Sequence, residues 1–373
     1  MTMTQLSADF LVIGGGIAGI SAAAELARDA SVILCEAEEQ LGYHATGRSA
    51  AIFISNYGNA TLRALSAAAH PALAGGALGQ SVLSARGEML VVQEHELDAL
   101  ASYLTGANGL ETLTPDEACA LVPVLRRDRI AAAVIERGAE DIDVETLLQG
   151  YTRLLKARGG QVIQGARVTA LARKTGLWQA RAGALTVSAP VVVNAAGAWA
   201  DHVAQLAGLP PIGLQPTRRS AALMAVPPEC LPLTHWPLFG SVAEDGKGWY
   251  AKPDGERLMI SPADEDPVEP HDAWPDDMVL AEGLHRFEHM VRLPIVKPSH
   301  TWAGLRSFAP DRSPIVGFDP ACEGFFWLAG QGGYGVQTAP ALATLTRTLA
   351  TKAPASQPES LLAALSPARL RRR

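Results

Sequence analysis

Residues 10–26 read FLVIGGGIAGISAAAEL, and this stretch decides the fold. Its opening apolar run predicts a buried strand, its glycines predict a tight turn, and its alanine-rich remainder predicts a helix. A second apolar run, residues 32–35, ends at the acidic Glu36. A strand, a glycine-rich turn, a helix and a second strand closed by a carboxylate are typical of a dinucleotide-binding unit.

Each part of this motif has a physical role in holding a dinucleotide. Gly14 allows the tight turn, Gly16 lets the backbone approach a pyrophosphate, and Gly19 lets the helix pack closely on the strand. The helix N-terminus offers free N–H groups and a positive dipole end to the phosphates. Glu36 can accept hydrogen bonds from both hydroxyls of an adenosine ribose. The pattern G-x-G-x-x-G alone is weak evidence, but with both strands and the acid it predicts dinucleotide binding.

The composition indicates a compact protein that is too long, at 373 residues, for one simple core. Hydrophobic residues make up 48% of the chain and charged residues 18%, which is ordinary for a soluble protein. The net charge of −7 argues against nucleic acid or an anionic membrane as the main partner. Residues 10–27 contain four glycines and no basic leader, so we interpret them as neither a signal peptide nor a membrane anchor. No other segment is long and apolar enough to predict a membrane span.

The cysteines and the basic C-terminus give two further expectations. Widely spaced cysteines without a C-x-x-C pattern favour reduced thiols, and hence a cytoplasmic location, over disulfides or a zinc site. A cluster of terminal arginines is expected to be solvated and disordered. These residues are Cys35, Cys119, Cys230 and Cys322, and Arg369, Arg371, Arg372 and Arg373.

Later segments repeat the pattern of the nucleotide-binding unit. Asp143 is a plausible N-cap for a helix with a leucine-rich face, which the glycines at 159 and 160 end. Strands are expected at residues 161–163, 167–172 and 191–193, with a hairpin through Trp178 and Leu185. A last buried strand at residues 325–329 precedes the glycine-rich turn GQGGYG and a helix from about residue 336 to 350.

Between these pieces the composition changes. Residues 81–142 and 201–304 contain more proline, more acids and alternating apolar patterns, which favour a substrate domain built on a sheet. Residues 264–277 are acidic and proline-rich and predict an exposed loop. We therefore predict an α/β fold, α+β overall, in which a discontinuous Rossmann-like domain is interleaved with a domain built on a mixed or antiparallel sheet. The nucleotide-binding domain comprises residues 1–80, 143–200 and 305–373, and the substrate-binding domain comprises residues 81–142 and 201–304.

A second glycine-rich turn that enters a helix is uncommon in simple NAD dehydrogenases. It suits a flavin, because a second helix N-terminus can stabilise negative charge on the N1–C2=O side of the reduced ring. With this turn, several segments together resemble the D-amino acid oxidase/dehydrogenase superfamily of FAD enzymes, nearly end to end. Within it the chain is most similar to the bacterial D-arginine dehydrogenases. The segments are the first glycine motif with Glu36, GYHATGRSAA at 42–51, NAAGAW at 194–199, TWAGLRSF at 301–308 and QGGYG at 331–335.

The resemblance implies a tightly held FAD that is noncovalent, because no cysteine lies near Arg306. It implies that Glu36 holds the ribose, that the backbone of Val168 touches the adenine, and that residues 49–51 lie along the flavin. It also implies that His44 supports the flavin-binding loop. The full expected set is Gly14, Gly16, Ile17, Ala18, Gly19, Glu36, Ala37, His44, Thr46, Arg48, Ser49, Ala50, Ala51, Val168, Ala196, Gly197, Trp199, Arg306, Gly332, Gly333, Tyr334, Gly335, Val336 and Gln337.

Two arginines stand out as candidates for binding a substrate carboxylate. A guanidinium holds a carboxylate with two parallel hydrogen bonds and does not lose its charge. For two arginines chosen at random from a sequence, a role in surface salt bridges is more common than a role in substrate binding. The resemblance implies that Arg219 and Arg306 bind the carboxylate and that Tyr57 and Tyr250 close over the substrate.

The resemblance also assigns Glu88 to a cationic substrate side chain, although from the residues alone it could equally be a solvated acid at a strand end. The chain departs from the D-arginine enzymes at Ile52 and Ile54, where those enzymes have a histidine and a threonine. With Gly333, these residues form the expected side-chain region, which should be less polar. If Glu88 points inward, we expect cationic D-amino acids; if it does not, we expect apolar ones such as D-leucine, D-methionine or D-phenylalanine.

The predicted activity is oxidative deamination of a D-amino acid to a 2-oxo acid and ammonia, with hydride transfer from Cα to flavin N5. No residue stands out as a base, so we expect solvent or the positive field of the site to favour the neutral amine. Two alternatives stay open: oxidation of a secondary or N-methyl amino acid, and a flavin subunit of an amine dehydrogenase complex. The electron acceptor, whether a quinone, a dye-type acceptor or dioxygen, is open as well. The H-x-x-E-H spacing at residues 285–289 lacks a third ligand, and we expect no metal.

Overall fold

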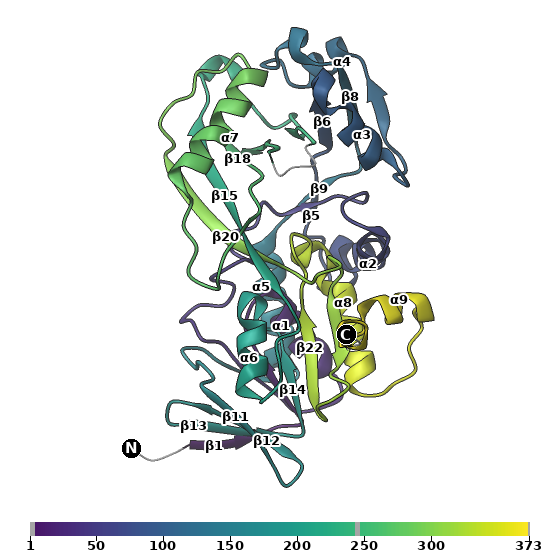
Figure 1. The fold of residues 1–373 in the computed structure, drawn as a ribbon, viewed down its shortest axis with the longest axis vertical. Helices are drawn as coiled ribbons and strands as arrows, with labels where there is room; N and C mark the ends of the chain where they lie inside the picture. Colours follow the sequence, from purple (N-terminus) through teal and green to yellow (C-terminus); the bar gives the residue numbers. More distant parts are fainter. Residues whose placement is uncertain (1–3, 243–246, 372–373) are drawn as a thin grey trace.

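Two lobes joined by two long strands form the molecule (Figure 1). The computed structural model describes residues 4–242 and 247–371. The connecting strands, β15 (Gln215–Ala225) and β20 (His300–Phe308), pair with each other in antiparallel fashion and run from one lobe into the other. The predicted α/β fold with a second domain on a mixed sheet is therefore confirmed.

The lower lobe in Figure 1 is built on a six-stranded sheet. Five strands are parallel, and the edge strand β21 runs antiparallel to β22. Its central strands are buried along their whole length, as expected for a parallel sheet covered on both faces. In order, the strands are β10 (Gln161–Ile163), β3 (Val32–Cys35), β2 (Phe10–Ile13), β14 (Val191–Asn194), β22 (Phe325–Ala329) and β21 (Ile315–Phe318).

Helices cover one face of this sheet, and a smaller sheet covers the other. Ile20, Leu147 and Leu342 represent the core under helices α1 (Ile17–Leu26), α5 (Val144–Ala157) and α8 (Gly335–Ala350). Asp143 caps α5 as predicted, because its carboxylate accepts a hydrogen bond from Thr146 N at 2.9 Å. The opposite face packs on α6 (Ala200–Leu206) and on the sheet of β1 (Thr4–Ser7), β13 (Leu185–Ala189), β12 (Leu177–Ala182) and β11 (Ala170–Lys174).

The upper lobe contains most of the nine-stranded sheet. Its pairings are antiparallel except for one parallel pair, β16 with β6. A core that includes Phe239, Trp249 and Phe287 lies under α4 (Pro115–Leu121) and α7 (Asp277–Met290). The strand order is β19 (Asp266–Pro267), β15, β18 (Arg257–Ser261), β17 (Tyr250–Asp254), β16 (Leu238–Gly240), β6 (Glu88–Val92), β8 (Ala132–Glu136) and β7 (Glu111–Leu113), with β20 also on β15.

Alternation along β6 sends its side chains to two different surroundings. Met89 and Val91 belong to the core under α4 and α7, whereas Leu90 and Val92 pack with Leu100 of α3 (Leu97–Leu104). Because successive side chains of a strand point to opposite faces, Glu88 shares the α3 face with Leu90.

A short three-stranded sheet connects the lobes. It consists of β4 (Ile52–Phe53), β9 (Glu140–Ile142) and β5 (Leu83–Ala85), which come from both predicted domains. Strand β20 also crosses the predicted boundary at residue 305, since it continues to Phe308. The remaining helices, α2 (Ala60–Pro71) and α9 (Glu359–Leu365), lie beside α8 and β21 in the lower lobe.

Three details of the sequence prediction are wrong. The basic C-terminus is not disordered over its described part, because Arg369 binds Asp311 and Arg371 binds Asp319. Arg372 and Arg373 lie outside the described residues. The acidic segment 264–277 is not simply exposed, because Asp264 is buried and accepts hydrogen bonds from Ser220. The strand expected at 167–172 instead spans Ala170–Lys174, because its register is set by antiparallel pairing with β12.

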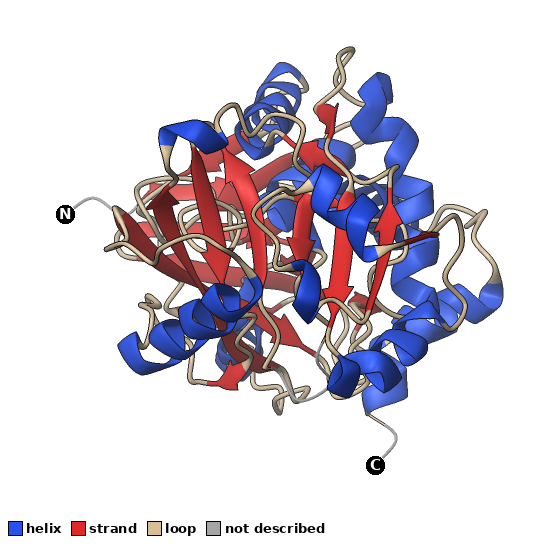
Figure 2. Ribbon diagram, turned by 90° about the horizontal axis from the view of Figure 1, so that it is seen from above, coloured by secondary structure: helices blue, strands red, loops and turns tan. Residues whose placement is uncertain are grey.

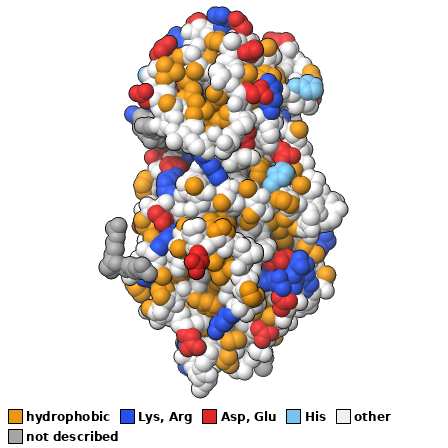
Figure 3. All heavy atoms as spheres, turned by 90° about the vertical axis from the view of Figure 1, so that its right-hand side faces the viewer, with side chains coloured by type: hydrophobic (Ala, Val, Ile, Leu, Met, Phe, Trp, Pro, Cys, Tyr) orange, Lys and Arg blue, Asp and Glu red, His pale blue; other side chains and the backbone are white. Residues whose placement is uncertain are grey.

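Seen from above, helices surround the central sheets on several sides (Figure 2). On the face in Figure 3, acidic and basic side chains are interspersed and no broad patch of one sign covers it. Within residues 4–242 and 247–371, no helix combines the length and apolar character needed to cross a bilayer.

Candidate active site

A cavity of about 510 Å³ runs along the carboxyl ends of β2, β3 and β14 and on to β20 and α8; we call it the nucleotide cavity. It lies where ligands bind in open parallel sheets. Most residues expected to bind the cofactor line it. They are Gly14, Gly16, Ile17, Ala18, Glu36, Ala37, His44, Thr46, Arg48, Ser49, Ala50, Val168, Ala196, Gly197, Trp199, Arg306, Gly332, Gly333, Gly335 and Val336.

The glycine turn has the geometry that its sequence predicts. Gly14 has φ +109°, and a Cβ there would lie 2.4 Å from Ala195 O. A Cβ on Gly19 would lie 1.9 Å from Gly14 O, so this position serves the packing of α1 on β2 rather than the cavity wall. The N-terminus of α1 opens into the cavity through Gly16 and Ile17, which is the arrangement that favours an anion.

Glu36 directly follows β3 and faces the same cavity. One of its carboxylate oxygens accepts a hydrogen bond from Gly15 N, and the other accepts one from Glu38 N at 2.8 Å. These bonds fix the orientation of the carboxylate. Because a carboxylate offers about four acceptor sites, two remain for ligand hydroxyls.

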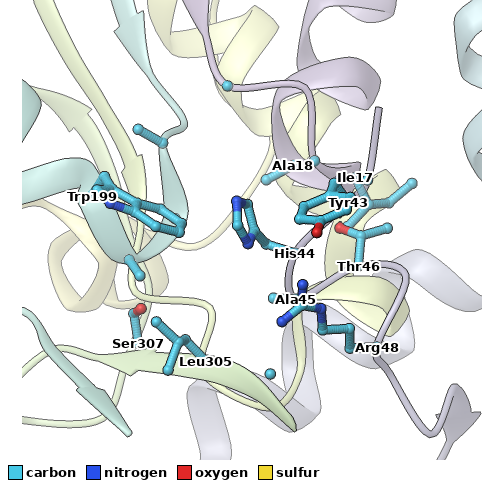
Figure 4. Close-up of a pocket in the computed structure, with 18 of the residues that line it drawn as sticks. Ile17, Ala18, Tyr43, His44, Ala45, Thr46, Arg48, Trp199, Leu305 and Ser307 are labelled. Carbon is cyan, nitrogen blue, oxygen red and sulfur yellow. Dashed lines mark hydrogen bonds between the residues drawn. The ribbon is translucent and has the colours of Figure 1, made fainter. Parts of the chain in front are cut away.

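The loop at residues 42–50 closes one side of the nucleotide cavity. Thr46 Oγ1 accepts a hydrogen bond from Ile17 N at 3.0 Å, so this hydroxyl also satisfies the first turn of α1. Figure 4 shows the ring of His44 beside that of Trp199; their centroids are 4.6 Å apart and their planes are tilted by 49°. Arg48 Nη1 donates to the carbonyl oxygens of Ala273 and Ala303, each at 3.0 Å, which ties the loop to the other lobe.

Four residues of the expected cofactor set lie elsewhere. Gly19 packs behind the turn, and Ala51, Tyr334 and Gln337 line a second cavity instead. Gln337 is buried and binds the backbone of Ile54 from both its amide atoms. It therefore holds the segment after β4 in place.

The second cavity, of about 560 Å³, adjoins the first; we call it the substrate cavity. Both cavities share Ser49, Ala50, Arg219, Tyr250, Arg306, Gly333 and Val336. The substrate cavity is also lined by the other residues expected to bind substrate, namely Tyr57, Glu88, Ile52 and Ile54. The structure thus brings all the predicted substrate residues together.

Strand pairing explains why the two arginines point the same way. Thr217 of β15 lies opposite Arg306 of β20, and Arg219 follows Thr217 by two residues. Cross-strand neighbours and residues two apart share one face of a sheet. Sequence separation hides this proximity, because the two strands are distant along the chain.

Arg306 has room because position 333 is a glycine. A Cβ on Gly333 would lie 2.8 Å from Arg306 Nη1. Arg306 Nη1 donates to Tyr57 Oη at 3.2 Å. Burial opposes the charge of Arg306, but Tyr57, Tyr250 and Glu265 more than offset this, and the pKa of Arg306 is raised.

Arg219 is already engaged by the protein. Its Nε donates to Asp264 O at 2.7 Å, and its Nη2 contacts Glu265 Oε1 at 3.2 Å. Arg312 also binds Glu265, at 3.0 and 3.1 Å. Sequence reasoning missed Glu265 and Arg312, which line the substrate cavity.

Tyr250 lines the shared part of the two cavities together with Arg219 and Arg306. Burial would raise the pKa of Tyr250, but the charges of Arg306 and Arg219, with hydrogen bonds from Ser261 and Arg219, lower it overall. Its hydroxyl is therefore held where positive charge is concentrated.

Glu88 points into the substrate cavity and is only 7% exposed. Tyr103 of α3, another residue that the sequence did not single out, donates its hydroxyl to Glu88 Oε2 at 3.2 Å. Burial and the neighbouring Glu136 raise the pKa of Glu88 to about 8, which the bond from Tyr103 only partly counters. The walls beside Glu88 are apolar and include Ile52, Ile54, Leu90 and Leu238.

The family model for FAD-dependent oxidoreductases named DAO matches residues 9–349. The chain belongs to this family. FAD is accordingly its cofactor, and the glycine cradle, the free α1 N-terminus and the oriented Glu36 fit the pyrophosphate and ribose of that group. The resemblance seen in the sequence is confirmed at the level of the family.

Individual relatives are more distant. Mouse mitochondrial sarcosine dehydrogenase is 25% identical over 248 residues, which cover 59% of this chain and 25% of that protein. The chain therefore spans about a quarter of that relative's length. The structures of L-proline dehydrogenase from P. horikoshii (TM-score 0.82, 21% identity, 100% of this chain and 99% of that one) and glycine oxidase from Geobacillus kaustophilus (TM-score 0.81, 24% identity, 97% and 98%) share its fold.

The H-x-x-E-H spacing lies on α7. His285 is highly exposed and lies 3.9 Å from Glu288. Across the described residues, no group of three or more side chains is arranged to hold a metal ion. All four cysteines are free thiols, and burial raises the pKa of Cys35 to about 12.

Proposed function

We propose that this protein oxidises a D-amino acid at Cα to the imine, which water then hydrolyses to a 2-oxo acid and ammonia. The single observation that carries the proposal is that Arg306 borders the nucleotide cavity and the substrate cavity at once. A carboxylate bound there has its neighbouring Cα at the junction of the two cavities. Bound FAD supplies the acceptor for the hydride that leaves Cα.

The side chains at this junction orient the substrate. Arg306 binds the carboxylate; its guanidinium donates to the Tyr57 hydroxyl, and Tyr250 lines the same shared part of the cavities. Arg219 supplies a second positive charge and reaches the carboxylate if Glu265 moves onto Arg312. Orientation of Cα is the main contribution of the protein, because the cofactor supplies the redox chemistry.

The reaction needs a neutral amine, whose lone pair assists hydride departure. Arg219 and Arg306 create a positive field in the shared part of the two cavities. A positive field disfavours an ammonium and so lowers the pKa of the substrate amine. The proton leaves to solvent.

The side-chain part of the substrate cavity favours an amino acid with an aliphatic stem and a cationic end. Ile52 and Ile54 offer apolar walls, and Glu88 offers an acceptor at the far end. D-arginine and D-lysine have this chemistry. The D configuration itself rests on the likeness to D-amino acid enzymes.

A second candidate is oxidation of a secondary or N-methyl amino acid. The similarity to sarcosine dehydrogenase, whose name gives an N-methyl amino acid as substrate, supports it. Such substrates also carry a carboxylate that Arg306 would bind. The two candidate substrate classes therefore differ in whether the amine is primary or secondary, and not in how the carboxylate is bound.

The test is anaerobic mixing of the FAD-loaded protein with D-amino acids, their L forms, sarcosine and N-methyl amino acids, while flavin absorbance is followed. Bleaching by D-arginine, D-lysine or D-leucine supports the proposal. Bleaching by N-methyl compounds alone supports the second candidate. Bleaching by L forms alone overturns the D configuration, and no bleaching by any of them favours a subunit of an amine dehydrogenase complex. Admitting air to the reduced samples then distinguishes an oxidase from a dehydrogenase.

A further inference from the structure

The cross-strand partner of Glu88 is another acid, Glu136. Glu88 of β6 lies directly opposite Glu136 of β8. Residues opposite each other in a sheet share one face, so both carboxyls lie on the α3 side. Both are buried, at 7% and 4% exposure. Two carboxylates cannot both be ionised at such a site without a large electrostatic cost.

The hydrogen bonds decide which of the two keeps the charge. Glu136 accepts from Ser55 N at 2.6 Å, from Asn56 N at 3.3 Å and from Asn56 Nδ2 at 2.6 Å. Among the described residues, Tyr103 is the only side chain that the structure gives Glu88 as a hydrogen-bond donor. Donors to a carboxylate stabilise its ionised form. Glu88 therefore has fewer donors to stabilise its ionised form, and burial beside Glu136 raises its pKa, so Glu88 is the member of the pair that takes up a proton.

Charged groups on the surrounding elements are engaged with other partners. Arg86, at the turn before β6, and Lys252 of β17 both bind Asp141. Arg137, next to Glu136, binds Glu111 of β7. The β16 residue opposite Glu88 is the apolar Leu238. The cations that the structure places elsewhere along the substrate cavity are Arg219 and Arg312, which both bind Glu265, and Arg306, which binds Tyr57.

We propose that Glu136 determines the substrate class by keeping Glu88 in a proton-dependent state, so that the protonated acid admits apolar side chains and the ionised acid selects cationic ones. This inference rests on the proposed function and adds a second residue that sets its specificity. Glu136 is not among the residues that line the substrate cavity and acts through Glu88 as a positioning residue. A single enzyme would thus accept both D-leucine and D-arginine, in proportions set by pH.

The expected pH dependence follows from the pKa of Glu88, which burial and the neighbouring Glu136 raise to about 8. Below that pH, a cationic side chain must displace the proton of Glu88, so its binding weakens about tenfold per pH unit. Binding of an apolar side chain below that pH leaves the proton on Glu88, so it does not depend on pH. The affinity for the apolar side chain falls only when Glu88 is ionised. The ratio of kcat/KM for D-arginine to that for D-leucine should therefore rise about tenfold per pH unit on both sides of pH 8. The midpoint is the pH at which the D-arginine profile levels off and the D-leucine profile begins to fall, and it should lie near the Glu88 pKa of about 8. Ionisations of the amine, of Tyr250 and of the flavin largely cancel in this ratio.

The experiment measures this ratio by anaerobic flavin reduction between about pH 6 and pH 9 for the holoprotein and three variants. Glu136→Gln removes the neighbouring charge and should move the midpoint to lower pH, by about one unit or more. Glu88→Gln should make the ratio independent of pH. Glu111→Gln, which removes an exposed acid on the adjacent strand β7, is the matched control and should leave the midpoint in place.

The outcomes separate this inference from the proposed function. Failure of both amino acids to bleach the flavin overturns the proposed function and the inference with it. Bleaching by both with a pH-independent ratio in the native protein overturns the inference alone, without need of any variant. A midpoint that Glu136→Gln leaves unchanged, in a variant with native circular dichroism and flavin spectra, overturns the role of Glu136. A merely structural role would change the amount of folded holoprotein and not the midpoint.

Discussion

Replacement of Gly333 by alanine tests the junction of the two cavities. A Cβ at this position would lie 2.8 Å from Arg306 Nη1 and 3.0 Å from its Cζ. Both distances are shorter than an ordinary van der Waals contact, so the guanidinium must move. The peptide itself tolerates alanine, because Gly333 does not have a positive φ. The effect is therefore confined to the side chain that the substrate carboxylate needs.

The magnitude follows from the hydrogen bonds of Arg306. A shifted guanidinium loses its bond to Tyr57 and at least one of the two bonds to a substrate carboxylate. A hydrogen bond to a charged group contributes about 1.5–3 kcal/mol. We therefore expect kcat/KM to fall by about 10- to 150-fold, with most of the loss in substrate affinity.

The assay is anaerobic flavin reduction over a range of substrate concentrations, which gives the apparent dissociation constant and the limiting rate separately. Gly138→Ala is the matched control, because no atom lies within 4 Å of the position that its methyl group would take and its φ is ordinary. This control should keep the native dissociation constant. A Gly333→Ala protein with native FAD content and an unchanged dissociation constant would refute the role given to Arg306.

Three further predictions concern the cofactor and stability. Glu36→Gln places an amide against the N–H groups of Gly15 and Glu38, so the FAD dissociation constant should rise at least about tenfold, measured by the fluorescence of released FAD. Gly19→Ala forces its methyl group against Gly14 O and should lower stability by about 1–3 kcal/mol, measured by thermal unfolding with and without added FAD. The raised pKa of Glu88 stabilises the fold at low pH, and this contribution is lost as pH rises from its ordinary value of 4.5 to about 8. Glu88→Gln should therefore flatten the decline of Tm over that range; an identical decline in the variant would contradict the assignment of the proton to Glu88.

The nucleotide half of the site could be predicted because its determinants are local. Gly14, Gly19 and Glu36 act within one βαβ unit, where spacing along the chain fixes spacing in space. The same holds for the cap at Asp143, which binds a residue three positions away. Local chemistry of this kind is readable in a single sequence.

The substrate half depends on strand register between distant segments. Arg219 and Arg306 meet because β15 pairs with β20, and Glu88 meets Glu136 because β6 pairs with β8. The role of Glu265 could not be predicted either. The sequence places it in an expected exposed loop, and only the folded structure brings it into contact with Arg219, 46 residues earlier in the chain. Resemblance to a family supplied some of these residues, but it could not supply their protonation or their internal partners.

The most direct test of substrate binding through Arg306 compares D-arginine with agmatine, which has the same amine and guanidinium side chain but no carboxylate. Each is mixed anaerobically with the FAD-loaded protein at equal concentration. We expect rapid bleaching by D-arginine, and bleaching by agmatine that is slower by at least about 100-fold because agmatine has no carboxylate for Arg306 to bind. Equal bleaching by the two compounds would contradict the claim that Arg306 positions the substrate through its carboxylate.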